Sequence, residues 1–339
     1  MTVSIAIGIF AHQEEKNICS IICEITKQSI IKYNGYRIEI YILANGCTDN
    51  TVVIAKDYIE RNNLSDICKL IVIDKAGKSN AWNMYVHDIC NSSYEYILFC
   101  DADIRIPDIS TIEKMTVVFD DNKNVCVINS KPIKDICYDV APINFIEKII
   151  TQSAGGFSDW KSSICGQLYI VRASAINNIY MPIGLPVEDG YIGAAIVTEN
   201  FNKLADVTKI HGVESIWHVY ESETKILSII KHQVRIVVGS AINYAIFTHF
   251  NQIGGNETND AQIKSACDES WLPSLISNFY PRKWGWIPPH FLLKRIKNFN
   301  INKANVNKLI YIFIGFVFDF IVYVKAQIVM IRGRGPGFW

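Results

Sequence analysis

The sequence predicts an α/β fold whose first half alternates strands and helices and whose last part is a helical tail. Three observations support this prediction. Short β-branched runs alternate with helical patterns, polar clusters follow four of these runs, and the charge turns basic after Pro281. Alternation of strands and helices at this spacing is typical of a mostly parallel sheet covered by helices on both faces.

The expected elements of the first half are short and regularly spaced. Strands are expected at residues 3–10, 37–43, 69–73 and 96–100, and helices at 15–31, 51–61 and 79–91. Farther along, the patterns predict a strand at 167–171, helices at 187–198 and 223–247, and a loop at 251–260. Open sheets bind ligands beyond the carboxyl ends of their strands, so the residues after each strand are candidates for a site.

Polar side chains follow the first four expected strands. Because neighbouring parallel strands end at one edge of a sheet, these clusters are expected to converge on a single crevice. The clusters are His12-Gln13-Glu14-Glu15, Asn45-Gly46-Cys47-Thr48-Asp49, Gly77-Lys78 and Asp101-Ala102-Asp103.

Asp101 and Asp103 come directly after the apolar run 96–100. Two carboxylates one residue apart can reach a single hard cation, and Mg²⁺ or Mn²⁺ favours such oxygen ligands shared with substrate phosphates. Two acids after a strand are also a common turn or helix cap, so the pair alone leaves both interpretations open.

Two glycine-containing turns could serve a nucleotide. The helix start at Gly77 and Lys78 suits an anion such as diphosphate, with a solvent-facing lysine as the alternative. The turn through Gly46 and Asp49 is compatible with a purely structural role, in which Asp49 or Thr48 caps the following helix.

Together these segments resemble the family 2 glycosyltransferases of the GT-A fold. In that family the first strand leads to an asparagine and glutamate pair, the second to a D-D-G-S-x-D-x-T turn, the third to a G-K-x-x-A-x-N helix start, and the fourth to D-x-D. The order and spacing agree over residues 1–110, and the similarity continues to Gly239. The matching segments here are Gln13-Glu14, Asn45-Gly46-Cys47-Thr48-Asp49-Asn50-Thr51, Gly77-Lys78-Ser79-Asn80-Ala81-Trp82-Asn83 and Asp101-Ala102-Asp103.

The resemblance implies a Rossmann-like mixed sheet and an inverting, hexosyltransferase-type enzyme that uses a nucleotide-sugar, with a UDP-sugar as the default donor. It also implies Mn²⁺ or Mg²⁺ held by Asp103 and Asp101, which would neutralise the departing diphosphate. The residues implied to bind the nucleotide-sugar are Ala11, Gln13, Glu14, Asn45, Lys78, Asp101, Ala102, Asp103 and Arg235.

The segment Leu185-Pro186-Val187-Glu188-Asp189-Gly190-Tyr191 resembles the family's acidic pair at a helix start, where an aspartate acts as base. A carboxylate near the anomeric carbon can take the proton of an incoming hydroxyl. Asp189 is therefore the candidate base and Glu188 the alternate, while helix capping by either acid is the structural alternative.

Other residues depart from the family pattern or match it weakly. Ala44 and Asn45 stand where the family has two aspartates, so an amide would replace the usual carboxylate contact to the nucleoside. Arg235 follows Gln233 too closely for the Q-x-x-R-W signature of processive relatives, so no polymer synthase is predicted. His218 is a candidate third metal ligand, with His211 as its competitor, although a histidine in an apolar strand is more often merely hydrogen-bonded.

Composition adds predictions about the surroundings of the protein. Half of the residues are apolar, only 19% are charged, and the net charge is zero. From Pro281 onward the sequence contains ten basic residues and a single acid, Asp319, which gives a net charge of +9. Trp284 and Trp286 lie among them. This tail favours an anionic phospholipid surface over nucleic acid, and the apolar run 309–324 favours an interfacial helix, with a buried helix as the alternative.

The chain is expected to divide into a glycosyltransferase domain at 1–250 and a basic, aromatic-rich helical tail at 251–339. Within the domain, residues 1–110 form the nucleotide-sugar half and 111–250 the acceptor half. Ten scattered cysteines and the lack of a signal-like start indicate reduced thiols and a cytoplasmic protein on the inner face of a membrane. The acceptor is a hydroxyl, with a lipid-linked glycan as a hypothesis.

Two rival functions remain at this point. A non-catalytic membrane-bound scaffold could retain the fold and bind a nucleotide-sugar. A sugar-phosphate nucleotidyltransferase is less favoured, because those enzymes carry a glycine-rich loop with arginine and lysine where this chain has Ala11-His12-Gln13-Glu14.

Overall fold

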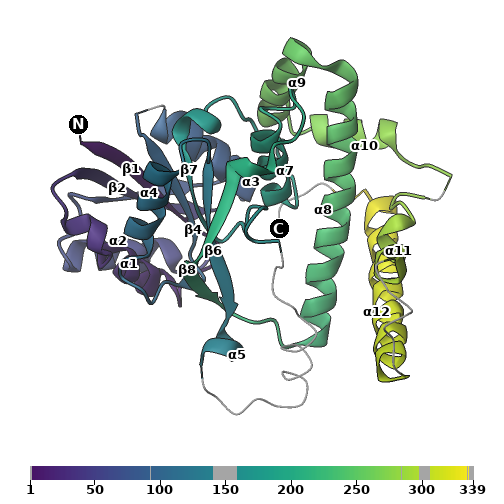
Figure 1. Cartoon of the computed structure of the whole chain (residues 1–339), viewed down its shortest axis with the longest axis horizontal. Coiled ribbons are helices and arrows are strands. Elements are labelled where there is room, and N and C mark those ends of the chain that lie inside the picture. The colour runs from purple at the N-terminus through teal and green to yellow at the C-terminus, as the bar shows by residue number, and fades with distance from the viewer. Residues whose placement is uncertain are drawn as a thin grey trace.

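The computed structural model describes residues 2–91, 93–139, 159–283, 285–297, 306–333 and 335. The strands of these residues form an eight-stranded sheet in the order β3-β2-β1-β4-β7-β6-β8-β5. Helices cover both faces of this sheet, and a set of long helices lies to one side of it (Figure 1).

The first half of the sheet is parallel. Strand β1 (Val3–Ala11) pairs in parallel with β2 (Tyr36–Asn45) and with β4 (Tyr96–Asp101), and β2 pairs in parallel with β3 (Cys68–Ile73). Most of β1 is buried, as expected of a parallel strand with helices on both sides. The four strands predicted for this half are therefore confirmed, and their carboxyl ends lie at one edge.

The second half makes the sheet mixed. Strand β7 (Leu168–Arg172) runs antiparallel to β4 and to β6 (Val127–Lys134), and β8 (Ile210–Tyr220) pairs in parallel with β6. The short strand β5 (Ile104–Arg105) closes the edge against β8. The parallel first half and the mixed sheet as a whole both agree with the fold predicted from the sequence.

The helices of the sheet domain divide between two apolar cores. One core contains buried side chains of α1, α2 and α4, and the other contains those of α3, α7 and α8. Helix α2 has the predicted bounds, whereas the predicted helices 15–31 and 79–91 are each split into two pieces. The bounds are α1 Ile18–Thr26, a 3₁₀ turn Ser29–Lys32, α2 Thr51–Arg61, α3 Lys78–Asn83, a π-helical segment Met84–Cys90, α4 Thr111–Asp121, α5 Asp135–Tyr138, a 3₁₀ turn Ala173–Ala175, α7 Glu188–Val197 and a 3₁₀ turn Val207–Lys209.

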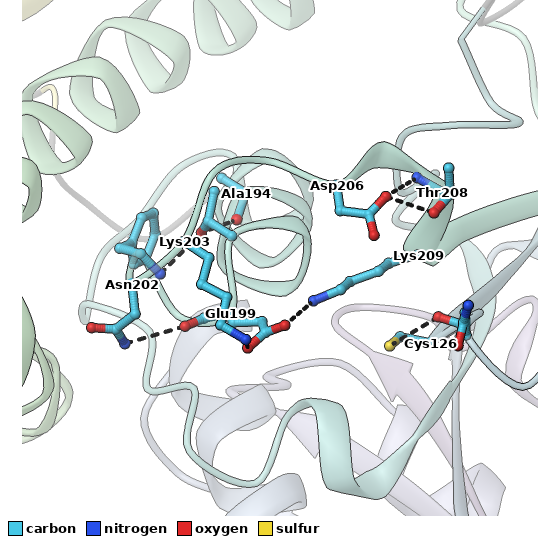
Figure 2. A network of polar contacts seen from close by, with 11 residues as sticks. Cys126, Ala194, Glu199, Asn202, Lys203, Asp206, Thr208 and Lys209 are labelled. Atoms are coloured by element: carbon cyan, nitrogen blue, oxygen red, sulfur yellow. Dashed lines mark hydrogen bonds and ion pairs between the residues drawn. The ribbon is translucent and has the colours of Figure 1, made fainter.

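A polar network fixes the connection from α7 to β8 (Figure 2). Glu199 accepts ion pairs from Lys203 at 2.5 Å and from Lys209 at 2.9 Å. Asp206 accepts hydrogen bonds from the backbone N and the Oγ1 of Thr208, at 3.0 and 2.6 Å. These contacts hold the C-terminal end of α7 against the sheet, and the acidic pair lies at the opposite end of that helix.

The remaining described helices are α8 (Ile226–Ile253), α9 (Gly255–Cys267), α10 (Trp271–Phe279), α11 (His290–Lys297) and α12 (Val306–Ile331). The predicted loop at 251–260 is wrong, because the chain turns only at Gly254, with φ 67°, and resumes as a helix at Gly255. The predicted boundary at residue 250 falls inside α8, and the division into two domains stays a prediction.

Helix α12 lies alongside α8 (Figure 1). Its buried residues Val322, Ala326 and Met330 recur every four positions and belong to the same core as α8. The segment Phe313–Ile331 has a mean hydropathy of 1.9 and is only 17% buried, and it is long and apolar enough to cross a membrane by length and composition. Its exposed apolar side chains are Phe313, Ile314, Val317, Phe320, Ile321, Val324, Ile328 and Ile331. Trp284, Lys303 and Arg334 of the predicted tail lie outside the described residues.

Candidate active site

A small pocket of about 250 Å³, open solvent at its mouth included, lies at the carboxyl edge of the sheet. It gathers residues from β1, α3, β4, β7 and α7, which are far apart in the sequence. Three acids and one lysine contribute its charge, and four aromatic side chains contribute its apolar part. The lining residues are Phe10, Lys78, Trp82, Phe99, Asp101, Gly166, Tyr169, Glu188 and Asp189.

Lys78 joins two of the acids that the sequence predicted for different roles. Its Nζ lies 2.7 Å from Oδ1 of Asp101 and 3.1 Å from Oε1 of Glu188. It also lies 3.4 Å from the carbonyl oxygen of Gly166. Lys78 is thus a counter-ion for both carboxylates, and the solvent-facing alternative does not describe it.

Burial and crowding of like charges shift the pKa values of this cluster. Burial, opposed by Lys78 and reinforced by Asp103, raises the pKa of Asp101 to about 7. Burial and the charge of Glu188 raise the pKa of Asp189 to about 6, against the charges of Lys78 and Arg235. Burial by itself would lower the pKa of Lys78, but Asp101 and Glu188 outweigh it and hold that pKa above its ordinary value. Such shifts in a pocket are characteristic of groups that exchange protons.

Asp189 lies in the first turn of α7, beside Glu188. Its Oδ1 accepts a hydrogen bond from the backbone N of Gly190 at 2.7 Å. Gly166 packs against it, since a Cβ at that glycine would lie 3.7 Å from Oδ2 of Asp189. The Asp189 carboxylate is therefore held on one side by the start of α7 and on the other by Gly166, which precedes β7.

Asp103 is exposed next to this pocket and is not among its lining residues. Its charge raises the pKa of Asp101 and contributes to the raised pKa of Glu14, for which burial is the larger cause. Ala102, between the two acids, is buried, and its backbone N donates to the carbonyl of Phe10 at 3.0 Å. Asp101 therefore lines the pocket, whereas Asp103 is exposed outside the lining and close enough to act on the charge of Asp101.

No group of three or more His, Cys, Asp or Glu side chains is arranged as a complete metal site in the part of the chain that the structure describes. The carboxylates of Asp101 and Asp103 nevertheless supply the oxygen ligands that Mg²⁺ and Mn²⁺ prefer. A partial set fits ions of this kind, because Mg²⁺ is usually held by one or two carboxylates together with substrate phosphates.

The loops after β1 and β2 are bound to each other. Oε1 of Gln13 accepts from the backbone N of Thr48 at 3.1 Å and of Asp49 at 3.0 Å. Oδ1 of Asp49 accepts from the N and the Oγ1 of Thr51, at 3.1 and 2.6 Å. Gln13 and Asp49 thus hold the turn and the start of α2, and Gln13 does so with φ 60°.

Asn45 and Gly46 occupy the base of this turn. Gly46 has φ 59°, and a Cβ there would lie 2.5 Å from that of Ala76, so only glycine fits. Asn45 is 6% exposed, and its Oδ1 has no hydrogen-bond partner among the described residues. Ala11, at the end of β1, is buried. The amide that replaces the family's carboxylate therefore has a buried, unpaired oxygen.

His218 is buried within β8 with both ring nitrogens engaged. Nδ1 lies 2.9 Å from Oγ of Ser130, and Nε2 lies 3.0 Å from Oε1 of Gln167. Burial lowers the pKa of His218 to about 3, so the ring is neutral. One of these bonds would have to break for His218 to bind a metal. His211 is exposed at the start of β8, and half-buried Arg235 on α8 lies close enough to lower the pKa of Asp189.

Sequence reasoning did not find the aromatic residues of the pocket. Trp82 occupies a variable position of the matched helix-start motif, and Tyr169 lies on a strand that carries no motif. Their positions follow from the pairing of β7 with β4, which brings Tyr169 opposite Phe99. Aromatic residues in strands and helices normally indicate only a core, so no sequence signal separates Trp82 and Tyr169 from the other aromatic residues.

The acidic pocket lies at the carboxyl edge of a mixed sheet, the arrangement that the resemblance to GT-A enzymes predicted from the sequence. Residues 6–165 match the family model described as glycosyl transferase family 2. These residues are a family 2 glycosyltransferase domain, and the protein is a glycosyltransferase; the family, fold class and enzyme class predicted from the sequence are confirmed. No curated protein sequence matches this chain.

Solved structures resemble this chain at low sequence identity, and the first of those below shares its fold. The mannosyltransferase PcManGT from Pyrobaculum calidifontis, in complex with GDP-Man and Mn²⁺, is 12% identical over 96% of this chain and 87% of its own, with a TM-score of 0.56. Mannosyl-3-phosphoglycerate synthase from Rubrobacter xylanophilus is 12% identical over 74% of this chain and 75% of its own, with a TM-score of 0.48. Glucosyl-3-phosphoglycerate synthase from Mycobacterium tuberculosis, in complex with Mn²⁺, UDP-Glc and phosphoglyceric acid, is 15% identical over 75% and 81%, with a TM-score of 0.46.

Proposed function

We propose that this glycosyltransferase moves a sugar from a nucleoside diphosphate sugar to an acceptor hydroxyl with inversion, and that Asp189 is the base. One observation carries the proposal: a single pocket holds Lys78, Asp101, Glu188 and Asp189 together. A non-catalytic scaffold would not require a carboxyl whose pKa is raised to about 6 beside a lysine with two carboxylate partners.

In the proposed reaction, the acceptor oxygen attacks the anomeric carbon from the side opposite the diphosphate. The new carbon–oxygen bond forms as the bond to the diphosphate oxygen breaks, and the hydroxyl proton passes to a carboxylate oxygen of Asp189. Glu188, held 3.1 Å from Nζ of Lys78, keeps its charge close to Asp189 and makes that carboxylate more basic. In this proposal the Lys78 ammonium separates from Asp101 and Glu188 and binds the diphosphate.

A divalent cation fits the entrance of the pocket. Asp103 and Asp101 would hold it there, and when bound it neutralises the charge that develops on the departing diphosphate. Oδ1 of Asp101 lies 2.7 Å from Nζ of Lys78, so the other oxygen of this carboxylate is the one proposed for the cation. We propose Mn²⁺ or Mg²⁺, in keeping with the Mn²⁺ in the complex of PcManGT. His218 is not included in the proposed ligand set, because both of its nitrogens are engaged.

The nucleoside is proposed to lie at the turn after β2. Asn45 offers a buried Oδ1 without a partner, which can accept a hydrogen bond from a base or ribose. A UDP-sugar is the proposed donor, and a GDP-sugar is the alternative because PcManGT was solved with GDP-Man. An amide can both donate and accept, so it is compatible with either base.

The function is tested by calorimetry with UDP and with GDP, each with and without Mn²⁺, followed by mass spectrometry of nucleotide-sugar hydrolysis. We expect metal-dependent binding of one diphosphate and release of that diphosphate from one sugar donor. Absence of metal-dependent binding would favour the scaffold. Release of inorganic diphosphate from a nucleoside triphosphate and a sugar phosphate would instead identify a nucleotidyltransferase.

A membrane role is proposed for the last part of the chain, 251–339, and a lipid-linked acceptor would follow from it. The exposed apolar face of α12 and the +9 charge after Pro281 support this, because anionic lipids attract basic segments beside apolar surface. The test is sedimentation with vesicles of phosphatidylglycerol and phosphatidylcholine. Phe320→Glu should reduce pelleting with anionic vesicles, whereas Val53→Glu, at an exposed apolar side chain of α2, should not. Failure of the unmodified protein to pellet would refute the membrane role.

A further inference from the structure

Part of the pocket lining comes from residues 160–167, a segment without helix or strand that leads into β7. Gly166 of this segment lines the pocket beside two of its charged groups. The carbonyl oxygen of Gly166 lies 3.4 Å from Nζ of Lys78, and a Cβ at this glycine would lie 3.4 Å from Cβ of Asp189. A shift of Gly166 would therefore be felt by both the lysine and the proposed base.

The backbone of Gln167, the next residue, is bound to the end of β4. The backbone N of Asp101 donates to the carbonyl oxygen of Gln167 at 2.8 Å, which extends the pairing of β4 with β7 by one residue. The backbone N of Gln167 also donates to the carbonyl oxygen of Cys165, so residues 165–167 form a tight turn around Gly166. Gln167 is thus connected to Asp101 directly and to Lys78 and Asp189 through Gly166.

The side chain of Gln167 is held by His218, which is completely buried in β8. Nε2 of His218 lies 3.0 Å from Oε1 of Gln167, and Nδ1 lies 2.9 Å from Oγ of Ser130. An amide oxygen can only accept, so Nε2 carries the proton and donates to Gln167, and Nδ1 accepts from the hydroxyl of Ser130. His218 does not line the pocket, and neither do its two partners. The imidazole therefore reaches the pocket through Gln167.

The other end of the segment is held by Asn129 of β6. Its Nδ2 donates to the carbonyl oxygens of Trp160 at 2.9 Å and Ser163 at 2.8 Å, and its Oδ1 accepts from the backbone N of Cys165 at 3.4 Å. Buried side chains thus supply the hydrogen bonds that a helix or strand would otherwise provide. The bond from His218 holds the residue next to Gly166, so it is the one whose loss would release the part of the segment that lines the pocket.

We infer that His218 is a positioning residue for the transfer reaction, which holds Gln167 and thereby fixes Gly166 and the backbone of Asp101. This role rests on the proposed function, because it assigns turnover to the pocket that contains Asp189. It also differs from the metal-ligand role that the sequence suggested for His218. Displacement of a reacting group by about 1 Å can cost about 10²-fold in rate, so a remote hydrogen bond of this kind can have a large effect on turnover.

The test compares His218→Phe with His218→Gln. Phenylalanine keeps a flat ring but has no nitrogen, whereas glutamine restores an N–H that can donate to Oε1 of Gln167. His249→Phe is the matched control, because His249 is half-buried on α8 beside Phe250 and Trp271 and does not line the pocket. Turnover is measured with Mn²⁺ as release of UDP or GDP from UDP-glucose, UDP-N-acetylglucosamine and GDP-mannose, with water as the acceptor.

The loss is expected in kcat. His218→Phe should lower kcat by about 10- to 100-fold, while the donor KM and the Mn²⁺ concentration for half-maximal rate stay within about threefold. His218→Gln should retain at least about three times the kcat of His218→Phe, and His249→Phe should match the unmodified protein. An unchanged kcat for His218→Phe would overturn the inference. Recovery of its rate at high Mn²⁺ would also overturn it, because His218 would then be a metal ligand.

A double-mutant cycle separates positioning from a merely structural role. Gln167→Leu removes the acceptor of the His218 bond, so adding His218→Phe to it should cost no further kcat beyond about twofold. Losses that multiply would show that His218 does not act through Gln167. If His218→Phe fails to fold, Gln167→Leu alone is compared with Ser130→Ala.

Ser130→Ala removes the other hydrogen bond of the same ring. It should lower the urea midpoint, but kcat well below the melting temperature should change by less than about threefold. If Ser130→Ala lowered kcat as much as His218→Phe or Gln167→Leu, the effect would be one of general stability and the inference would be wrong.

The unmodified protein separates the inference from the proposed function. If it releases a nucleoside diphosphate from one of the donors and Asp189→Asn abolishes this release, the proposed function stands, and the variants at 218, 167 and 130 decide the inference alone. If the unmodified protein releases no diphosphate from any donor with Mn²⁺, the proposed function fails and the inference fails with it.

Discussion

Two polar regions at the carboxyl edge of the sheet use their side chains in different ways. In the loops after β1 and β2, Gln13 and Asp49 satisfy backbone N–H groups of the neighbouring loop and of the start of α2. In the pocket between β4, α3 and α7, charged side chains face one another, and Asp101 and Asp189 have pKa values raised to about 7 and about 6. Both regions carry matched family motifs.

The comparison shows that the polar side chains of a family motif can serve two physical purposes. The loop region is stabilised by its own hydrogen bonds, so its polar side chains mainly hold shape. The pocket holds like charges together at a cost in stability, which is the usual property of a site that acts on protons or ions. Changes in the first region should therefore alter stability more than turnover, and changes in the second should alter turnover most.

The largest effect is expected for Asp189→Asn. An amide cannot take the proton of the acceptor, so turnover should fall by about 10²- to 10⁴-fold. Calorimetry should show nucleotide binding close to that of the unmodified protein, and the melting temperature should not fall. Glu188→Gln is the matched control with a smaller loss. If Glu188→Gln abolished turnover and Asp189→Asn did not, Glu188 would be the base.

A smaller effect is expected on stability for Lys78→Gln. This change leaves Asp101 and Glu188 close together without their counter-ion, at a cost of about 1–3 kcal/mol in the free energy of unfolding. Lys69→Gln is the control, because its ion pair with Glu39 is at the surface and is worth at most about 1 kcal/mol. If urea denaturation gave equal losses in the free energy of unfolding for the two variants, the Lys78 cluster would not differ in stability from an ordinary surface ion pair.

The pH dependence of turnover should report the protonation of Asp189 in the pocket. Because burial and Glu188 raise the pKa of Asp189 to about 6, the folded protein holds this proton more tightly than usual, and the base form is present only above that pH. The rate should rise with pH through a midpoint of about 6 and level off above about pH 7. Removing the charge of Glu188 in Glu188→Gln should lower the pKa of Asp189 and shift the midpoint to lower pH. A rate independent of pH between 5 and 7 would argue against this base.

The smallest effect is expected in the loop region, for Asp49→Ala. The change removes the acceptor for the N and Oγ1 of Thr51 at the start of α2, which should cost about 1 kcal/mol of stability. Turnover at a temperature well below the melting point should change by less than about threefold, a difference of under 1 kcal/mol. A loss of turnover as large as that of Asp189→Asn would show that the two regions do not differ as described.

Much of the fold was predictable because local chemistry dictates it. The β-branched runs of β1 to β4 can only be buried in a covered sheet, and Lys78, Asp101 and the acidic pair follow or begin elements at positions where ligand groups gather. The sequence did not predict that two helices are split. It also did not predict that α8 and α9 continue through 251–260, because Gly254 interrupts the helix for one residue only. The hydrogen-bond partners of His218 could not be predicted either, since Ser130 and Gln167 lie far from it in the sequence.

The sequence by itself determined the order of strands and helices and the residue types at their ends, because hydrophobic periodicity and turn chemistry act over a few neighbouring residues. Only the tertiary structure decided which of those end groups satisfy one another and which remain available. Lys78 meets Glu188, and Trp82 meets the Phe99 and Tyr169 stack, because α3, α7 and β7 pack against one edge of the sheet. Contacts between groups so distant in the chain depend on sheet order and helix packing, which no local pattern specifies.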